Sequence, residues 1–159
     1  MKLEYEDLLG RKFDLGRQDC ATLTQEFYLN NFGIKISNYA RPTDWDSKTL
    51  DIIGMSYERE GFFKVVNWET DLHPADVLCM AIGSSVANHY AVYLGGNEII
   101  HHMLNGRSVK EPLRGYYRNA TRYVLRHPDL VSLKEAPLPT TTVEELLNER
   151  NHPKPGASN

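Results

Sequence analysis

Residues 88–103 read NHYAVYLGGNEIIHHM, and the fold class can be worked out from this stretch. Two runs rich in β-branched and aromatic side chains, 89–94 and 98–103, flank a Gly-Gly-Asn turn. Runs of this composition on both sides of a glycine-containing turn are typical of a β-hairpin, whose two strands pair in antiparallel fashion. The stretch therefore predicts an antiparallel sheet.

The register of this hairpin decides whether two of its histidines meet. One register pairs Leu94 with Glu98 at the turn. In that register His89 lies one diagonal step from His101 on the same face of the sheet, about 7–8 Å away between backbones. His102 then points to the opposite face, because successive side chains alternate along a strand. A register shifted by two residues places the first two histidines directly opposite each other, whereas a shift by one separates them.

Upstream of the hairpin the apolar side chains recur with a helical period. We predict a helix over 20–31, with Asp19 as its N-cap and Gly33 as its stop. A second helix is predicted over 46–60. From there the pattern becomes that of short strands, which we predict over 62–68, 77–82, 89–94, 98–103 and 121–126. Helices first and short strands later indicate an α+β fold with N-terminal helices packed on an antiparallel sheet.

The composition excludes several classes of protein. The 159 residues are 41% hydrophobic and 25% charged, and 18 basic against 21 acidic side chains give a formal net charge of −3. These values exclude disorder over most of the chain, and the slightly acidic balance predicts no nucleic-acid partner. No apolar run approaches the roughly 18 residues of a membrane span, so no membrane insertion is expected. The first residues also lack the apolar core of a signal peptide.

The composition changes after His127 and Pro128, which predicts a globular domain over 1–128 and an appendage over 129–159. Within the appendage, residues 137–142 have the composition of an extended linker. A capping-box pattern from Thr142 predicts a short helix, and the tail after it has no apolar anchor, so we expect disorder there.

The two cysteines are too few for a disulfide framework and too far apart for a cysteine-rich zinc site. Cys79 lies in an apolar run and is interpreted as a small buried hydrophobe. Cys20 opens the first predicted helix, where unpaired N–H groups and the helix dipole stabilise a thiolate. A thiol nucleophile needs a base held by a third polar group, so His89 and His101 complete a candidate catalytic set.

Three motifs together resemble those of NlpC-type cysteine peptidases, papain-like enzymes that cut bacterial cell-wall peptides. Residues 10–23 resemble the lead-in to the family's Asp-Cys helix start, and residues 74–78 resemble its Pro-Gly-Asp turn into a core strand. Residues 88–101 resemble its histidine hairpin, with the same spacing of twelve between the histidines. Residues 41–45 and 115–127 add a narrower resemblance to the peptidase domains of phage tail assembly proteins.

The resemblance assigns a role to each candidate residue. It makes Cys20 the nucleophile, His89 the general base and His101 the partner that orients His89. It also suggests weaker substrate contacts from Asp19, Phe13 and Asn88, although a helix cap explains Asp19 equally well. An alanine, Ala21, stands where the family often has serine, which puts the fine specificity in doubt.

The resemblance implies a papain-like phage tail-tip endopeptidase that hydrolyses peptidoglycan stem peptides, with the γ-D-glutamyl–diaminopimelate bond as its target and no cofactor. Such a chain is made in the host cytoplasm without a signal peptide, is carried on the virion beside other tail-tip proteins, and acts in the periplasm. The alternative is a non-enzymatic tail-tip assembly component whose triad is vestigial. A further alternative is a metal site made of Cys20, His89 and His101.

Overall fold

The structure of the chain, a computed structural model, describes residues 2–40 and 50–130. Its elements, in chain order, are η1 (Glu6–Leu8), α1 (Cys20–Phe32), α2 (Ile52–Ser56), β1 (Phe63–Lys64), β2 (Val77–Met80), β3 (His89–Gly95), β4 (Glu98–His102), β5 (Ser108–Pro112), α3 (Gly115–Ala120), β6 (Thr121–Arg126) and η2 (Pro128–Leu130). The strands form one sheet in the order β1-β6-β2-β3-β4-β5, and every pair of neighbours is antiparallel. The α+β class with an antiparallel sheet is therefore confirmed.

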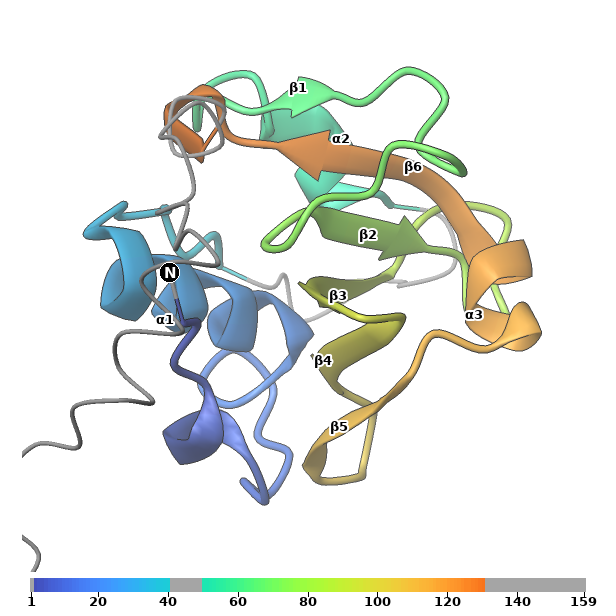
Figure 1. Cartoon of the computed structure of the whole chain (residues 1–159). Helices are drawn as coiled ribbons and strands as arrows, with labels where there is room; N and C mark the ends of the chain where they lie inside the picture. The colour runs from blue at the N-terminus through green and yellow to red at the C-terminus, as the bar shows by residue number, and fades with distance from the viewer. Residues whose placement is uncertain (1, 41–49, 131–159) are drawn as a thin grey trace, which may run out of the picture.

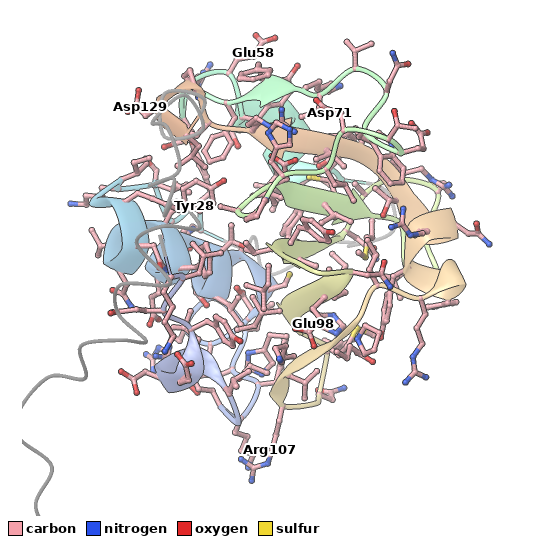
Figure 2. The ribbon with its side chains drawn as sticks, viewed as in Figure 1. Tyr28, Glu58, Asp71, Glu98, Arg107 and Asp129 are labelled. Atoms are coloured by element: carbon pink, nitrogen blue, oxygen red, sulfur yellow. The ribbon has the colours of Figure 1, made fainter. Side chains whose placement is uncertain are left out.

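Helix α1 lies on one side of the sheet and packs against β3 and β4 (Figure 1). Figure 2 shows Tyr28 in the layer between α1 and the sheet. Its hydroxyl donates to the carbonyl oxygen of Ala75 at 2.5 Å, and its side chain is fully buried. The buried aromatic ring and its hydrogen bond fix the helix to the turn that leads into β2.

The sheet is covered by apolar side chains on both faces. One buried cluster lies between α1 and the sheet and includes Phe27 and Tyr28 from the helix and Val92 and Ile100 from the strands. The other lies on the opposite face and is built around the buried residues Leu78, Met80, Ala91, Ile99 and Leu113, with Tyr117 packed against it. Because both faces of β2, β3 and β4 carry buried side chains, these central strands are held rigidly, and they supply the base of the site described below.

The prediction for the first helix is confirmed, and the second is wrong in length. The described part of the second prediction is helical only over Ile52–Ser56. The helix begins there because the side chain of Asp51 accepts from the Gly54 N–H at 2.7 Å and caps it. The chain then continues in turns as far as Gly61, which lies in the left-handed region at φ +84°. The first part of the prediction, residues 46–49, falls outside the described residues.

The strand predictions hold for the centre of the sheet and fail at its edges. The strand predicted over 62–68 is shorter in the structure, where β1 covers Phe63–Lys64. The Val65 N–H still donates to the Val124 carbonyl oxygen at 2.9 Å, and the chain then turns at Asn67, which lies in the left-handed region at φ 56°. The strand β5 and the helix α3 were not predicted at all. The predicted domain boundary at 128 falls at the start of η2, and residues 131–159 of the predicted appendage lie outside the described residues.

In the described ranges, 2–40 and 50–130, the helices are all too short or too polar to cross a membrane.

Candidate active site

Cys20 is the first residue of α1, and the residue before it fixes where the helix begins. Asp19 accepts from the backbone N–H of Thr22 at 2.9 Å, and the Thr22 hydroxyl accepts from the Asp19 N–H at 2.8 Å. This reciprocal capping box starts the helix at Cys20. The second carboxylate oxygen of Asp19 accepts from the Gly16 N–H at 2.7 Å, so the cap also holds the loop in front of the helix. Asp19 is therefore confirmed as the N-cap.

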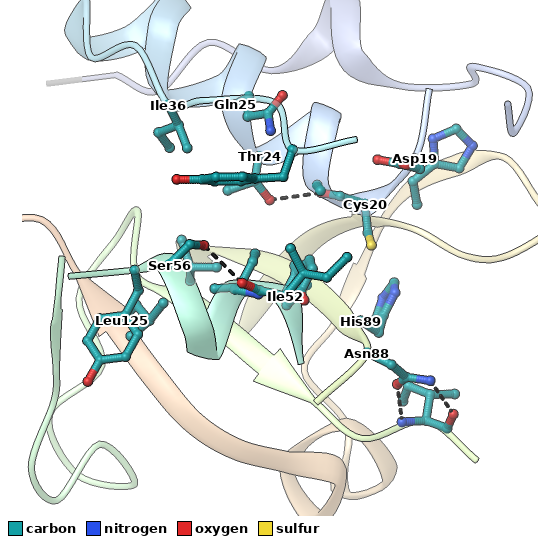
Figure 3. Close-up of a pocket in the computed structure, with 18 of the residues that line it drawn as sticks. Asp19, Cys20, Thr24, Gln25, Ile36, Ile52, Ser56, Asn88, His89 and Leu125 are labelled. Carbon is teal, nitrogen blue, oxygen red and sulfur yellow. Dashed lines mark hydrogen bonds between the residues drawn. The ribbon is translucent and has the colours of Figure 1, made fainter. Parts of the chain in front are cut away.

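Cys20 and His89 line the same cavity, which has a volume of about 420 Å³. The cavity lies between α1, α2 and the ends of the central strands. Figure 3 shows the Cys20 side chain directed from the start of the helix toward the ring of His89. Cys20 is partly exposed, and it lies at the positive end of the helix dipole, which stabilises a thiolate. The structure thus brings a thiol and an imidazole together from opposite sides of the cavity.

The two histidines of the hairpin are joined by a hydrogen bond. In the sheet register Ala91 is opposite His101, so His89 lies one diagonal step away, as the sequence predicted. The Nε2 atom of His89 is 2.8 Å from the Nδ1 atom of His101, with an angle of 71° between the rings. Both rings are nearly or fully buried. Because Nε2 of His89 is bonded to His101, Nδ1 is the ring nitrogen of His89 that can exchange a proton with a group in the cavity.

Burial keeps this pair neutral. The main cause is desolvation, and with the positive charges that His101 and His102 would add it lowers the pKa of His89 to about 3. Burial also lowers the pKa of His101, although its hydrogen bond to Glu111 opposes this. In its neutral form His89 keeps a lone pair that can accept a proton, which a general base must offer.

Glu111 and Tyr117 extend the hydrogen-bonded chain beyond the residues that the sequence singled out. The Nε2 atom of His101 lies 2.6 Å from Oε1 of Glu111, on β5. The Tyr117 hydroxyl, on α3, donates to the same oxygen at 2.8 Å, and its ring meets the His101 ring edge-on at 5.1 Å. Both residues come from elements that were not predicted. The available signal was a carboxylate ten residues after His101, but without a predicted strand it could not be placed.

The weaker candidates lie around the cavity in different roles. Phe13 lines it and meets the ring of His102 edge-on at 5.7 Å. Asn88 also lines it, but its amide is bonded at both ends to the backbone of Ile82, at 2.8 and 3.0 Å (Figure 3). His102 is buried on the face opposite His101, and its Nε2 atom has no hydrogen-bond partner among the described residues. The substrate contacts suggested for Phe13, Asp19 and Asn88 remain predictions.

Cys79 is fully buried in β2, which confirms its interpretation as a core residue. Burial raises the pKa of its thiol well above the ordinary value, so it stays protonated at neutral pH. Across residues 2–40 and 50–130, His, Cys, Asp and Glu side chains do not gather in any group of three or more that could hold a metal ion.

In a comparison with known families, the NlpC/P60 family matches residues 10–126. The matched range contains Cys20, His89 and His101 as well as Glu111 and Tyr117.

Two curated relatives are similar to this chain, and both are named tail tip assembly protein K. The protein of Escherichia phage lambda is 32% identical over 120 residues, which cover 76% of this chain and 59% of that protein. The protein of Escherichia phage N15 is 26% identical over 125 residues, which cover 77% of this chain and 50% of that protein. The chain therefore spans only about half to three-fifths of the length of these relatives.

Among solved structures, the crystal structure of the NlpC/p60 domain of the peptidoglycan hydrolase SagA aligns with a TM-score of 0.49 at 18% identity. The alignment covers 76% of this chain and 90% of that chain.

Proposed function

This chain belongs to the NlpC/P60 family, and on that premise we propose that it is a phage tail-tip cysteine endopeptidase that hydrolyses peptidoglycan stem peptides. The observation that supports the proposal most is the arrangement of Cys20 and His89 on one cavity, with His89 bonded to His101 at 2.8 Å. A thiol at a helix N-terminus, a neutral imidazole and an orienting partner are the groups that acyl transfer to cysteine needs.

The proposed reaction has two steps. Cys20 gives its proton to His89 and its sulfur attacks the carbonyl carbon of the scissile peptide bond. His89 then passes the proton to the leaving nitrogen, so that an amine departs and a thioester to Cys20 remains. In the second step His89 takes a proton from water, the hydroxyl attacks the thioester, and a carboxylic acid is released while the thiol is restored. The backbone N–H of Cys20 is a candidate donor to the oxyanion in both steps.

We propose the γ-D-glutamyl–diaminopimelate bond as the target and the tail tip of the virion as the place from which the enzyme reaches the periplasm. The names of the two phage relatives support the location, because both are tail tip assembly proteins. The same names suggest other tail-tip proteins as partners. The substrate class rests on the family resemblance of the cysteine and histidine motifs.

Digestion of purified sacculi, followed by mass analysis of the released peptides, tests both the activity and the bond. The wild-type chain should release peptides with a new D-glutamyl carboxyl end, and Cys20→Ala and His89→Gln should release none above background. Cys79→Ala is the matched control, since it removes the other thiol from a buried position outside the cavity, and it should keep the activity.

Folded wild-type protein that releases nothing would contradict the proposal and favour the alternative of an assembly component with a vestigial triad. The metal alternative makes a different prediction, because a chelator would then abolish the activity. We expect hydrolysis to be insensitive to a chelator, since cysteine acyl transfer needs no metal.

A further inference from the structure

Glu111 is related to His101 as His101 is related to His89: each lies one diagonal step away on the neighbouring strand. In the pairing of β4 with β5, Ile99 is opposite Glu111 and His101 is opposite Val109. Glu111 is therefore one diagonal step from His101, on the face that also carries His89. Two diagonal steps across three neighbouring strands produce a continuous chain of contacts, at 2.8 Å between the histidines and 2.6 Å from His101 to the carboxylate.

This chain of contacts fixes where the protons are. An ionised carboxylate can only accept a hydrogen bond, so His101 must carry its proton on Nε2, which faces Glu111. A neutral His101 then has its lone pair on Nδ1, which faces His89. His89 must in turn donate from Nε2, and its remaining lone pair is on Nδ1. One carboxylate therefore sets the tautomers of both rings.

The Glu111 carboxylate is ionised at neutral pH. Burial raises its pKa, but the hydrogen bonds from Tyr117 and His101 and the charge of Arg114 together lower it below the ordinary value. Its side chain is 28% exposed, while that of His101 is 0% exposed. The charge of Glu111 thus reaches the buried rings through a hydrogen bond rather than through solvent.

We infer that Glu111, held by the Tyr117 hydroxyl, is a positioning residue that turns the lone pair of His89 toward the Cys20 thiol. The inference rests on the proposed function, since it assigns His89 as the base. Glu111 also stabilises the imidazolium that forms when His89 takes the thiol proton, because a negative charge then lies one ring away. Two other titratable groups influence this chain of contacts. A charge on His102, which points to the opposite face, would lower the pKa of both rings, and the charge of Arg114 lowers the pKa of Glu111.

The test uses Glu111→Gln, which keeps the size of the side chain but removes its charge and offers an N–H₂ group to His101. The matched control is Glu98→Gln, which removes an exposed carboxylate paired with Lys110 on the same two strands. The first readout is the ¹⁵N NMR of the imidazoles in the full chain. We expect His89 and His101 to carry protons on Nε2 in the wild type and the control, and a second tautomer to appear in Glu111→Gln.

The second readout is the pH profile of kcat/KM on stem peptides. Loss of the outer partner of a metal-bound histidine typically costs roughly 10–100-fold. By analogy, we expect a loss of this size in Glu111→Gln and none in Glu98→Gln. The acidic limb of the profile should also move to lower pH, because an imidazolium without a nearby carboxylate is less stable. A merely structural role would not move the limb.

The outcomes separate the two proposals. If the wild type hydrolyses nothing, the proposed function fails, and the tautomers alone decide whether Glu111 positions the rings. If the wild type is active and Glu111→Gln keeps both its rate and its tautomers, the inference is overturned. Should Glu111→Gln fail to fold, Tyr117→Phe replaces it, because it removes only the second bond to the carboxylate. We expect a smaller loss of rate from Tyr117→Phe, and an unchanged rate would count against the inference.

Discussion

Alkylation of the native chain with iodoacetamide at neutral pH should modify Cys20 and leave Cys79 untouched. The reagent reacts with thiolates that solvent can reach. Cys20 is partly exposed on the cavity at the N-terminus of α1, where the helix dipole stabilises the thiolate. Cys79 is 0% exposed, and burial raises the pKa of its thiol.

The structure indicates how much faster Cys20 should be alkylated than Cys79. Cys79 lies in β2, which pairs with β3 on one side and β6 on the other, so the reagent reaches it only when the centre of the sheet opens. Opening of a central strand costs close to the full free energy of unfolding, about 5–15 kcal/mol. Even at about 5 kcal/mol, only about 2 molecules in 10⁴ are open, since each 1.36 kcal/mol is a factor of ten. Cys20 should therefore react faster by about 10³-fold or more.

Peptide mapping by mass spectrometry over a time course measures both rates in one sample. The chain unfolded in urea is the control, and there the two thiols should react at similar rates. His89→Gln should slow the reaction of Cys20 without changing that of Cys79, because the imidazole no longer accepts the thiol proton. Labelling of Cys79 within tenfold of Cys20 in the native chain would refute both the burial argument and the assignment of the nucleophile.

Three further predictions concern the buried groups. Asp76→Asn removes the carboxylate to which Arg126 donates two 2.7 Å bonds, while the bonds from Arg126 to Asp71 remain. It should lower the free energy of unfolding in urea by about 1.5–3 kcal/mol, and a loss below about 0.5 kcal/mol would contradict this. The pKa of His89 is lowered to about 3 in the folded chain, so the contribution of its neutral ring to the free energy of unfolding is complete above pH 6.5 and is lost as the pH falls toward 3. The free energy of unfolding, measured between pH 4 and 7, should therefore depend less on pH in His89→Gln. His101→Ala should lower kcat/KM on stem peptides by about 10³-fold or more, whereas His101→Asn should keep part of the rate because its amide oxygen can still accept a hydrogen bond from His89. Equal losses in the two variants would show that the loss of this hydrogen bond does not cause the loss of rate.

The parts of the fold with a strong local signal could be predicted from the sequence. Helix α1 was predicted within one residue at its end because Asp19 caps it and Gly33, in the left-handed region at φ 67°, stops it. The hairpin register was right at Ala91 and His101 but wrong at the turn, where Gly95 rather than Leu94 pairs with Glu98. The register shifts between Tyr93 and Gly95, where β3 forms a β-bulge. This bulge was not predicted because two consecutive glycines allow several turn geometries.

The missed elements have weak local patterns. Strand β5 reads Ser-Val-Lys-Glu-Pro and lies at the edge of the sheet, so it has neither apolar alternation nor a buried face along its length. Helix α3 reads Gly-Tyr-Tyr-Arg-Asn-Ala, six residues that are too few to show a helical apolar period. It is helical because Ala120 is buried and Tyr117 packs against the sheet, which are tertiary contacts that no local pattern reveals.

Ala75 is a single residue whose conformation depends on tertiary contacts that a local sequence pattern does not show. In the turn before β2 it adopts φ +75°, the left-handed conformation that favours glycine, where the family's Pro-Gly-Asp motif has its glycine. The Ala75 N–H donates to the backbone carbonyl oxygen of Tyr93 at 2.7 Å, and the Ala75 carbonyl oxygen accepts from the Tyr28 hydroxyl, so two tertiary bonds hold the strained residue. The sequence identified the turn by resemblance, but the contacts that make alanine tolerable there belong to residues far along the chain.

The candidate site depends on two placements that are independent of each other. The capping box at Asp19 fixes the turn of α1 at which the Cys20 sulfur enters the cavity, and it involves only neighbouring residues. The register of β3 against β4 fixes which histidine stands behind His89, and a slip by one residue would replace His101 with His102, which points to the other face. The bulge at the turn absorbs its extra residue before the pairing reaches Ala91, so it leaves this register intact. The capping box is local, so the position of Cys20 can be predicted from the sequence. The row of hydrogen bonds that begins at His89 and His101 ends at Glu111 on an edge strand without a local pattern, and only the structure reveals it.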